Sequence, residues 1–319
     1  MMRVLFMGTP FFASACLEAL FCSGRFEIVG VVSQPDRPKG RGMVCHPCEV
    51  KVLTEQYGLT LWQPERINAP EFLEIFHSQR PDLVAVVAYG QKIPAEILYG
   101  PKFGCVNVHG SLLPKYRGAA PIQWSILNGD RVTGVTTMYM DEGWDTGDMI
   151  YHEQIAINPN EKFCDLYGRL AVLGGKLLVR TLIDIENGTA PRIKQDDAQA
   201  TLAPKLQPEL ARINWASQAA SIHNLVRVFS PSPGAETFFG KERLKIIETQ
   251  IQSAELIKAD QAQPGCIIQI IKQQGILVAT GDRPLLITKV QPEGKKVMTA
   301  LDYANGRRLE PGIILDALD

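Results

Sequence analysis

The sequence contains no apolar run of about 18 residues, the length that a helix needs to cross a membrane. It also begins without the charged region and cleavage site of a signal peptide, so we expect a cytoplasmic protein with no membrane partner. Its seven cysteines are odd in number and scattered, which is typical of reduced thiols and argues against a disulfide framework.

Two common ligand motifs are incomplete. Cys45, His46 and Cys48 offer three soft ligands, but a structural zinc site takes four and no second pair lies at a suitable spacing. We therefore predict no metal. The turn at 8–10, Gly-Thr-Pro, lacks two glycines of the G-x-G-x-x-G dinucleotide motif, which argues against a dehydrogenase.

The charge balance argues against a protein coated in positive potential, since the net charge is −1. An RNA partner stays compatible with this value, because RNA binding depends on a local basic patch rather than on the total charge.

What is present in the first half is an alternation of buried strands and helical stretches. This pattern predicts the α/β class, with a Rossmann-like, doubly wound and mostly parallel sheet. We expect strands at 4–7, 26–33 and 83–88, and helices at 10–21, 50–57, 69–79 and 165–186.

The chain is long enough for two domains. Residues 190–208 are polar and contain three prolines, so we expect a linker between a domain of residues 1–189 and one of residues 209–319. The second half predicts a helix at 215–228 and short strands near 244–251, 265–271, 275–280 and 285–290. Short strands separated by Gly and Pro favour a small barrel.

The segment 104–121, GCVNVHGSLLPKYRGAAP, carries the strongest chemical signal. A strand at Cys105–His109 would place Asn107 and His109 on one face, at the strand end where open α/β sheets bind ligands. Asp145, in a separate loop with glycines, could orient the imidazole. A histidine at a strand end is more often structural than catalytic, so these residues alone leave both interpretations open.

Longer stretches of the sequence favour the catalytic interpretation of these residues. NVHGSLLPKYRGAAPIQWSILNGD and TGVTTMYMDEGWDTGDMI resemble the folate-dependent formyltransferases, as do VLFMGTPFFASACLEAL, VSQPDRPKGRG and DLVAVVAYGQKIP before them. The resemblance implies 10-formyltetrahydrofolate as formyl donor and Asn107, His109 and Asp145 as the catalytic set. The folate-binding residues that it implies are Ser111, Leu112, Leu113, Pro114, Ala88, Tyr89, Gly90, Gln91, Lys92, Ile93 and Asp141.

The second half is similar to the members of this family that formylate methionyl-tRNA, through APKL, INW, VRVFSPSPGAETFF, GILVATGD and QPEGKKVM. This implies an OB-like barrel and initiator methionyl-tRNA as acceptor. The residues expected to contact tRNA are Arg37, Lys39, Arg41, Lys205, Lys295 and Lys296. Two departures concern RNA contact: 43–46 reads MVCH where relatives often carry lysines, and Ser232 replaces a common aromatic residue.

Three functions stay open at this point. The first is formylation of methionyl-tRNA, the second is formyl transfer to a small amine such as an amino sugar nucleotide, and the third is noncatalytic RNA binding. His109 can donate a proton if charged or accept one if neutral. We expect a monomer, because the sequence contains no coiled coil or symmetric apolar patch.

Overall fold

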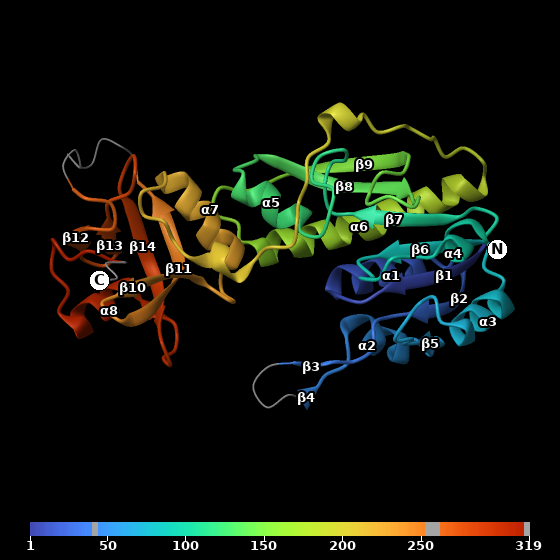
Figure 1. Cartoon of the computed structure of the whole chain (residues 1–319), viewed down its shortest axis with the longest axis horizontal. Coiled ribbons are helices and arrows are strands. Elements are labelled where there is room, and N and C mark those ends of the chain that lie inside the picture. The colour runs from blue at the N-terminus through green and yellow to red at the C-terminus, as the bar shows by residue number, and fades with distance from the viewer. Residues whose placement is uncertain (40–43, 253–261, 316–319) are drawn as a thin grey trace. The chain divides into compact units, whose positions relative to one another are not determined.

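The computed structural model describes residues 1–39, 44–252 and 262–315, which form two compact units (Figure 1). The first unit consists of Met1–Pro121, Val132–Ala156 and Leu166–Pro204. The second consists of Ile122–Arg131, Ile157–Asp165 and Lys205–Asp319. The chain therefore leaves the first unit and returns to it twice before its final crossing.

A seven-stranded sheet forms the centre of the first unit (Figure 1). Its order is β5 (Leu61–Trp62), β2 (Glu27–Val32), β1 (Arg3–Gly8), β6 (Leu83–Val87), β7 (Cys105–His109), β8 (Val132–Tyr139) and β9 (Met149–Ala156). Neighbours from β5 to β7 are parallel, and β8 and β9 are antiparallel. The predicted mostly parallel sheet is confirmed, and the four predicted strands agree within one residue.

Helices pack on both faces of this sheet. On one face, α6 (Phe163–Glu186) approaches α1 (Phe11–Ser23) and β7 closely: a Cβ added at Gly174 would lie 3.1 Å from Val108. On the other face, α3 (Pro70–Gln79) and α4 (Ala95–Tyr99) contribute Phe72, Phe76 and Ile97 to a buried core with Leu5. A further predicted helix is observed as α2 (Glu49–Gln56). The observed bounds of the four predicted helices of this unit differ from the predicted bounds by at most two residues.

Several elements of the first unit were not predicted. The strands β8 and β9 extend the sheet beyond β7, although glycine and threonine interrupt the apolar pattern of β8. The strands β3 (Pro38–Lys39) and β4 (Val44–Cys45) form a separate antiparallel pair. Among the described residues, no helix is long and apolar enough to cross a membrane.

Part of the segment predicted as a linker pairs with the first unit. Arg117 donates its backbone N–H to Thr201 (2.8 Å) and accepts from Ala203 (2.7 Å). Ile193 and Met149 exchange two further backbone hydrogen bonds. Residues 190–204 thus lie against the loops that follow β7 and β8.

The sheet of the second unit is antiparallel. Its order is β10 (Ala235–Phe239), β11 (Glu242–Ile251), β14 (Leu285–Pro292), β13 (Gly275–Val278) and β12 (Ile267–Ile271), and β15 (Met298–Thr299) also pairs with β14. The four predicted strands are confirmed, and the closure of this sheet into an OB-like barrel stays a prediction. The helix predicted at 215–228 begins only at Ala219 (α7, Ala219–Phe229), after the buried Trp215.

Early segments of the chain complete this unit. Most of α5 (Pro121–Leu127) and the residues that lead into α6 belong to it, although they precede residue 166. Its last helix is α8 (Ala300–Arg307). From α7, His223 Nε2 donates to the carbonyl of Pro159 (3.1 Å) and Arg227 donates to that of Glu161 (3.2 Å). Burial lowers the pKa of His223, so the neutral ring is favoured there.

Gly134 tests the packing of β8. A Cβ at this position would lie 2.1 Å from the backbone oxygen of Glu153 and 2.5 Å from Leu112, so the backbone must shift. We expect Gly134→Ala to lower the free energy of unfolding by about 1–3 kcal/mol, measured by urea denaturation.

Gly168 is the matched control, because it lies in α6 of the same unit with open space around it. Gly168→Ala should raise the free energy of unfolding by about 0.5–1 kcal/mol. Equal effects of the two substitutions would contradict the packing described for β8.

Candidate active site

The loops that follow β1, β2 and β6 meet at the carboxyl edge of the parallel sheet. Gln34 connects them: its backbone N–H donates to Thr9 Oγ1 (3.1 Å) and its side chain donates to the carbonyl of Tyr89 (3.1 Å). Gln91 Nε2 donates to Gln34 Oε1 (3.3 Å). This edge is where open α/β sheets bind their ligands.

Asn107 and His109 extend from β7 at the same edge. Val108 packs toward α6, whereas Cys105 contributes to the core on the opposite face. Side chains alternate along a strand, so Asn107 and His109 share the face of Cys105, as the sequence predicts. His109 is buried and Asn107 is half-buried.

Asp145 joins these two side chains from the loop after β8. Its Oδ2 accepts from the backbone N–H of Gly118 (2.8 Å) and lies 3.6 Å from His109 Nδ1. Its Oδ1 accepts a longer hydrogen bond from Asn107 Nδ2 (3.5 Å). The structure thus brings together the three residues that the sequence singles out.

A hydrogen bond of His109 locates one hydrogen of its ring. Nε2 lies 2.8 Å from the carbonyl oxygen of Tyr116, which can only accept, so Nε2 carries a hydrogen. Nδ1 faces the Asp145 carboxylate. The separation of 3.6 Å exceeds a hydrogen-bond distance, so the contact with Asp145 is an ion pair when the ring is charged.

The loop at 111–114 is held by internal hydrogen bonds. Ser111 is buried, and its hydroxyl donates to the carbonyl of Lys115 (2.6 Å). The buried Thr136 hydroxyl donates to the Ser111 carbonyl (2.7 Å) and accepts from the N–H of Leu113 (3.2 Å). Leu112 and Pro114, both partly buried, belong to the same loop.

The predicted folate loop at 88–93 has an irregular backbone. Ala88 and Gly90 have φ values of 45° and 92° and are exposed, so backbone groups are accessible there. Tyr89 is buried, which raises the pKa of its phenol, and its hydroxyl has no hydrogen-bond partner among the described residues. Gln91 accepts from the N–H of Ile67 (2.8 Å).

A cavity of about 410 Å³ connects this loop with the one that carries Asp145. Gln91, Lys92, Ile93 and Glu142 line it, together with residues 66–68. Its volume is within the range of small-molecule sites. Asp141 Oδ1 accepts from Gly143 N (3.0 Å) and Thr146 Oγ1 (2.7 Å), so this carboxylate shapes the loop.

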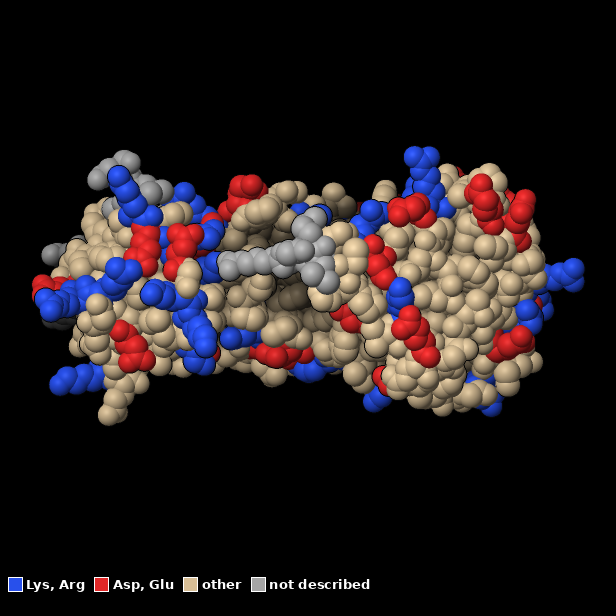
Figure 2. All heavy atoms as spheres, turned by 90° about the horizontal axis from the view of Figure 1, so that it is seen from below, with Lys and Arg blue, Asp and Glu red and all other residues tan. Residues whose placement is uncertain are grey.

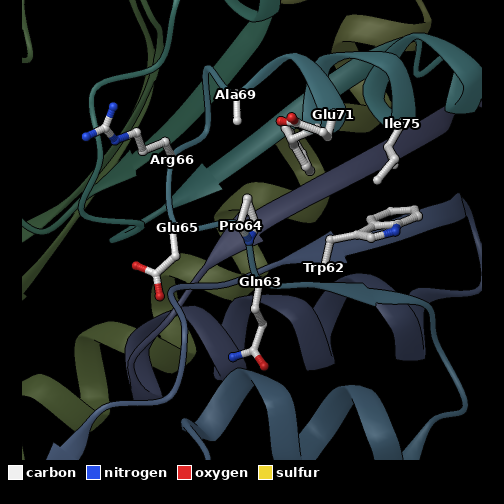
Figure 3. A pocket seen from close by; sticks show the side chains of 9 residues that line it. Trp62, Gln63, Pro64, Glu65, Arg66, Ala69, Glu71 and Ile75 are labelled. Carbon is white, nitrogen blue, oxygen red and sulfur yellow. The ribbon is translucent and has the colours of Figure 1, made fainter.

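A second cavity, of about 460 Å³, was not predicted (Figure 3). The side chains of Trp62 and Ile75 lie on one side of it, and Arg66 also lines the cavity beside the folate loop. Sequence reasoning missed it because β5, which carries Trp62, has only two residues. The residues that line it are Trp62, Gln63, Pro64, Glu65, Arg66, Ala69, Glu71, Phe72 and Ile75.

The basic loop after β2 is anchored at its base. Lys51 Nζ lies 2.6 Å from Asp36 Oδ2, and hydrogen bonds from Lys51 and Gln63 hold the pKa of Asp36 below its usual value. Arg37 pairs with Glu65 (2.9 Å) on the surface. Lys39 ends β3, and Arg41 lies outside the described residues.

The predicted basic residues of the second unit are all exposed: Lys205, Lys295 and Lys296. Two other basic residues are balanced by acidic partners, since Arg243 pairs with Glu236 and Glu293, and Arg307 pairs with Glu242. Figure 2 shows acidic side chains among the basic ones on this unit, at the left of the view. Local exposure, rather than the count of basic residues, therefore selects the candidates for phosphate contact.

Sequence reasoning also missed Arg117 and Gln195. Arg117 is buried, and its guanidinium donates to Gln195 Oε1 (3.0 Å) and Asp197 Oδ1 (2.7 Å). Gln195 in turn contacts the loop of Asp145. Within the described ranges, no three His, Cys, Asp or Glu side chains form a group that could hold a metal ion.

Comparison with protein families matches residues 2–182 to "Formyl transferase" and residues 205–308 to "Formyl transferase, C-terminal domain". The chain is 44% identical over 314 residues to a methionyl-tRNA formyltransferase of Desulforamulus reducens, covering 98% of each chain. It is 46% identical over 308 residues to that of Solibacter usitatus, covering 97% of this chain and 96% of the relative.

Solved structures share the fold at lower identity. An N-formyltransferase of Helicobacter canadensis, in complex with folinic acid and dTDP-3-aminofucose, has a TM-score of 0.63 at 20% identity, covering 92% of this chain and 100% of that one. HypX of Aquifex aeolicus, in complex with tetrahydrofolic acid, has a TM-score of 0.62 at 18% identity. That match covers 95% of this chain, which spans about half of HypX (47%).

Proposed function

The chain belongs to the formyl transferase family, and we propose that it transfers the formyl group of 10-formyltetrahydrofolate to the α-amino group of initiator methionyl-tRNA. The product is N-formylmethionyl-tRNA, used for translation initiation. The observation that carries the chemistry is the convergence of Asn107, His109 and Asp145 at the carboxyl edge of the sheet. Similarity to methionyl-tRNA formyltransferases across both halves of the chain supports methionyl-tRNA as the acceptor.

In this reaction the amine attacks the formyl carbon, and negative charge develops on the formyl oxygen. The Asn107 amide has two hydrogens, and its bond to Asp145 uses one. The second can donate to the oxygen that becomes charged. Loss of one such donor typically costs about 10²–10³-fold in rate.

His109 and Asp145 act as a pair in this proposal. The doubly protonated imidazole stabilises the negative intermediate, and the carboxylate 3.6 Å away balances its charge and holds its orientation. The amine proton is then transferred to N10 of the folate as the C–N10 bond breaks. Asp145 directs this transfer through a water, because a doubly protonated ring has no free nitrogen to accept the proton.

The binding of folate is assigned to the loops at 88–93, 111–114 and 141–145. The cavity between Gln91, Lys92, Ile93 and Glu142 supports this assignment, because it adjoins the loop that carries Asp145. Ala88 and Gly90 are exposed, and their backbone N–H and C=O groups can form hydrogen bonds with a pterin ring.

The acceptor is tested by transfer of radiolabelled formyl from 10-formyltetrahydrofolate to three acceptors in parallel: initiator methionyl-tRNA, free methionine and a dTDP-amino sugar. We expect turnover with methionyl-tRNA alone. Turnover with the amino sugar alone would overturn the proposed acceptor and leave the catalytic residues in place. No turnover with any acceptor would support a noncatalytic RNA-binding protein.

The catalytic roles are tested by Asn107→Ala, His109→Ala and Asp145→Asn. Each should lower kcat for methionyl-tRNA by about 10²-fold or more, because the three changes remove, in turn, the donor to the formyl oxygen, the positive charge that stabilises the intermediate and the carboxylate that organises both. Asp165→Asn, at an exposed position of α6, is the control for loss of one carboxylate charge. A variant that keeps the wild-type kcat would remove its residue from the mechanism.

Contact with tRNA is tested at the exposed pair Lys295 and Lys296. If each contacts a phosphate, the double variant Lys295→Gln/Lys296→Gln should bind methionyl-tRNA more weakly. The negative slope of log binding constant against log salt concentration should also become less steep by about two. Filter binding at several salt concentrations measures both. Lys272→Gln, at another exposed position, should leave the slope unchanged, and a matching slope in all variants would exclude this contact.

A further inference from the structure

Asp145 has a left-handed backbone, a conformation that is uncommon for residues other than glycine. Its φ value of 54° lies in the left-handed region, which glycine adopts readily and other residues adopt at a cost. This conformation turns its carboxylate toward His109 and the N–H of Gly118. A residue in such a conformation persists only where its surroundings hold it.

Gln195 provides such a hold from the backbone side. Its side-chain Nε2 donates to the carbonyl of Asp145 (2.8 Å) and to that of Gly147 (2.8 Å). The two hydrogens of one amide thus bind two carbonyls of the same loop, on either side of Thr146. The loop is fixed on both sides of its turn by a residue about fifty positions later in the chain.

Arg117 determines which way the Gln195 amide points. Its Nε donates to Gln195 Oε1 (3.0 Å), so the oxygen faces the guanidinium and the nitrogen faces the loop. Its Nη2 pairs with Asp197 (2.7 Å), and its backbone pairs with Thr201 and Ala203. Gly118, the next residue, donates to the Asp145 carboxylate.

We propose that Gln195 is a positioning residue for the reaction, which holds Asp145 toward His109 and Asn107, and that Arg117 orients its amide. The proposal rests on the catalytic role of Asp145 proposed above. It also assigns a function to the segment 190–204: this segment completes the active site of the first unit.

The first test compares Gln195→Ala with Gln199→Ala. Gln199 is exposed on the same segment, and its amide bonds to Asp196 rather than to a catalytic loop. Gln195→Ala should lower kcat by about 10²-fold, as expected for a misplaced catalytic group, with KM for methionyl-tRNA nearly unchanged. Gln199→Ala should keep the wild-type kcat, and wild-type kcat in both variants would overturn the proposal.

A double-mutant cycle with Asp145→Asn tests whether Gln195 acts through the carboxylate. In single-turnover measurements, Gln195→Ala should add no further loss to Asp145→Asn. Independent losses that multiply would show that Gln195 acts elsewhere. Wild-type kcat in Asp145→Asn would instead reject the catalytic role of Asp145, so the two failures are distinguishable.

Trp144 reports directly on this loop, because it precedes Asp145 and is 73% exposed. With 5-fluorotryptophan incorporated, the chain gives four ¹⁹F resonances, and Trp144→Phe identifies the one of Trp144. Gln195→Ala should shift or broaden this resonance and leave those of Trp62, Trp124 and Trp215 unchanged. An unchanged Trp144 resonance would contradict a positioning role.

General destabilisation would change all four resonances. In that case the isosteric Gln195→Glu replaces the alanine variant, since it keeps the shape of the side chain and removes the donor to the two carbonyls. A wild-type kcat together with an unchanged Trp144 resonance in Gln195→Glu would overturn the proposal.

Discussion

The candidate site depends on one carboxylate. Asp145 accepts from the backbone of Gly118 and from Asn107 and lies 3.6 Å from His109, so it connects the loops after β7 and β8 with the strand β7 itself. A parallel sheet brings its strand ends to one edge, but the antiparallel strand β8 ends beside Val106, near the start of β7, so the loop that follows β8 has to turn back to bring Asp145 to His109. The turn after β8 then has to reverse the chain sharply, which accounts for its glycines and for the left-handed backbone of Asp145.

Much of this arrangement follows from the sequence. Continuous apolar runs predict the buried strands at 4–7 and 83–88, and alternation places Asn107 and His109 on the same face of Cys105–His109. These features are local, so a single chain segment contains the information. The strands β8 and β9 escape prediction because β9 contains three consecutive polar residues, 152–154, and β8 contains Gly134 between Thr133 and Thr136.

The remainder could not be predicted because it depends on partners distant in the chain. Nothing near Gln195 indicates that its amide binds two carbonyls fifty residues earlier, since the surrounding segment has the polar composition of a linker. The same holds for charge: Arg243 alternates with Lys241 and Lys245 in the sequence, yet ion pairs with Glu236 and Glu293 balance its positive charge. Long-range hydrogen bonds and ion pairs determine which polar residues are accessible, and composition does not encode them.

The interrupted course of the chain has a consequence for synthesis on the ribosome. Residues 122–131 and 157–165 emerge early, but they belong to the unit whose remaining residues, from 205 onward, emerge last. The carbonyls of Pro159 and Glu161 therefore lack their hydrogen-bond donors until His223 and Arg227 of α7 have been made, whereas the strands of the parallel sheet can already pair. Folding during synthesis is consequently not a simple succession of two domains. The second unit needs segments that the ribosome makes between the segments of the first unit.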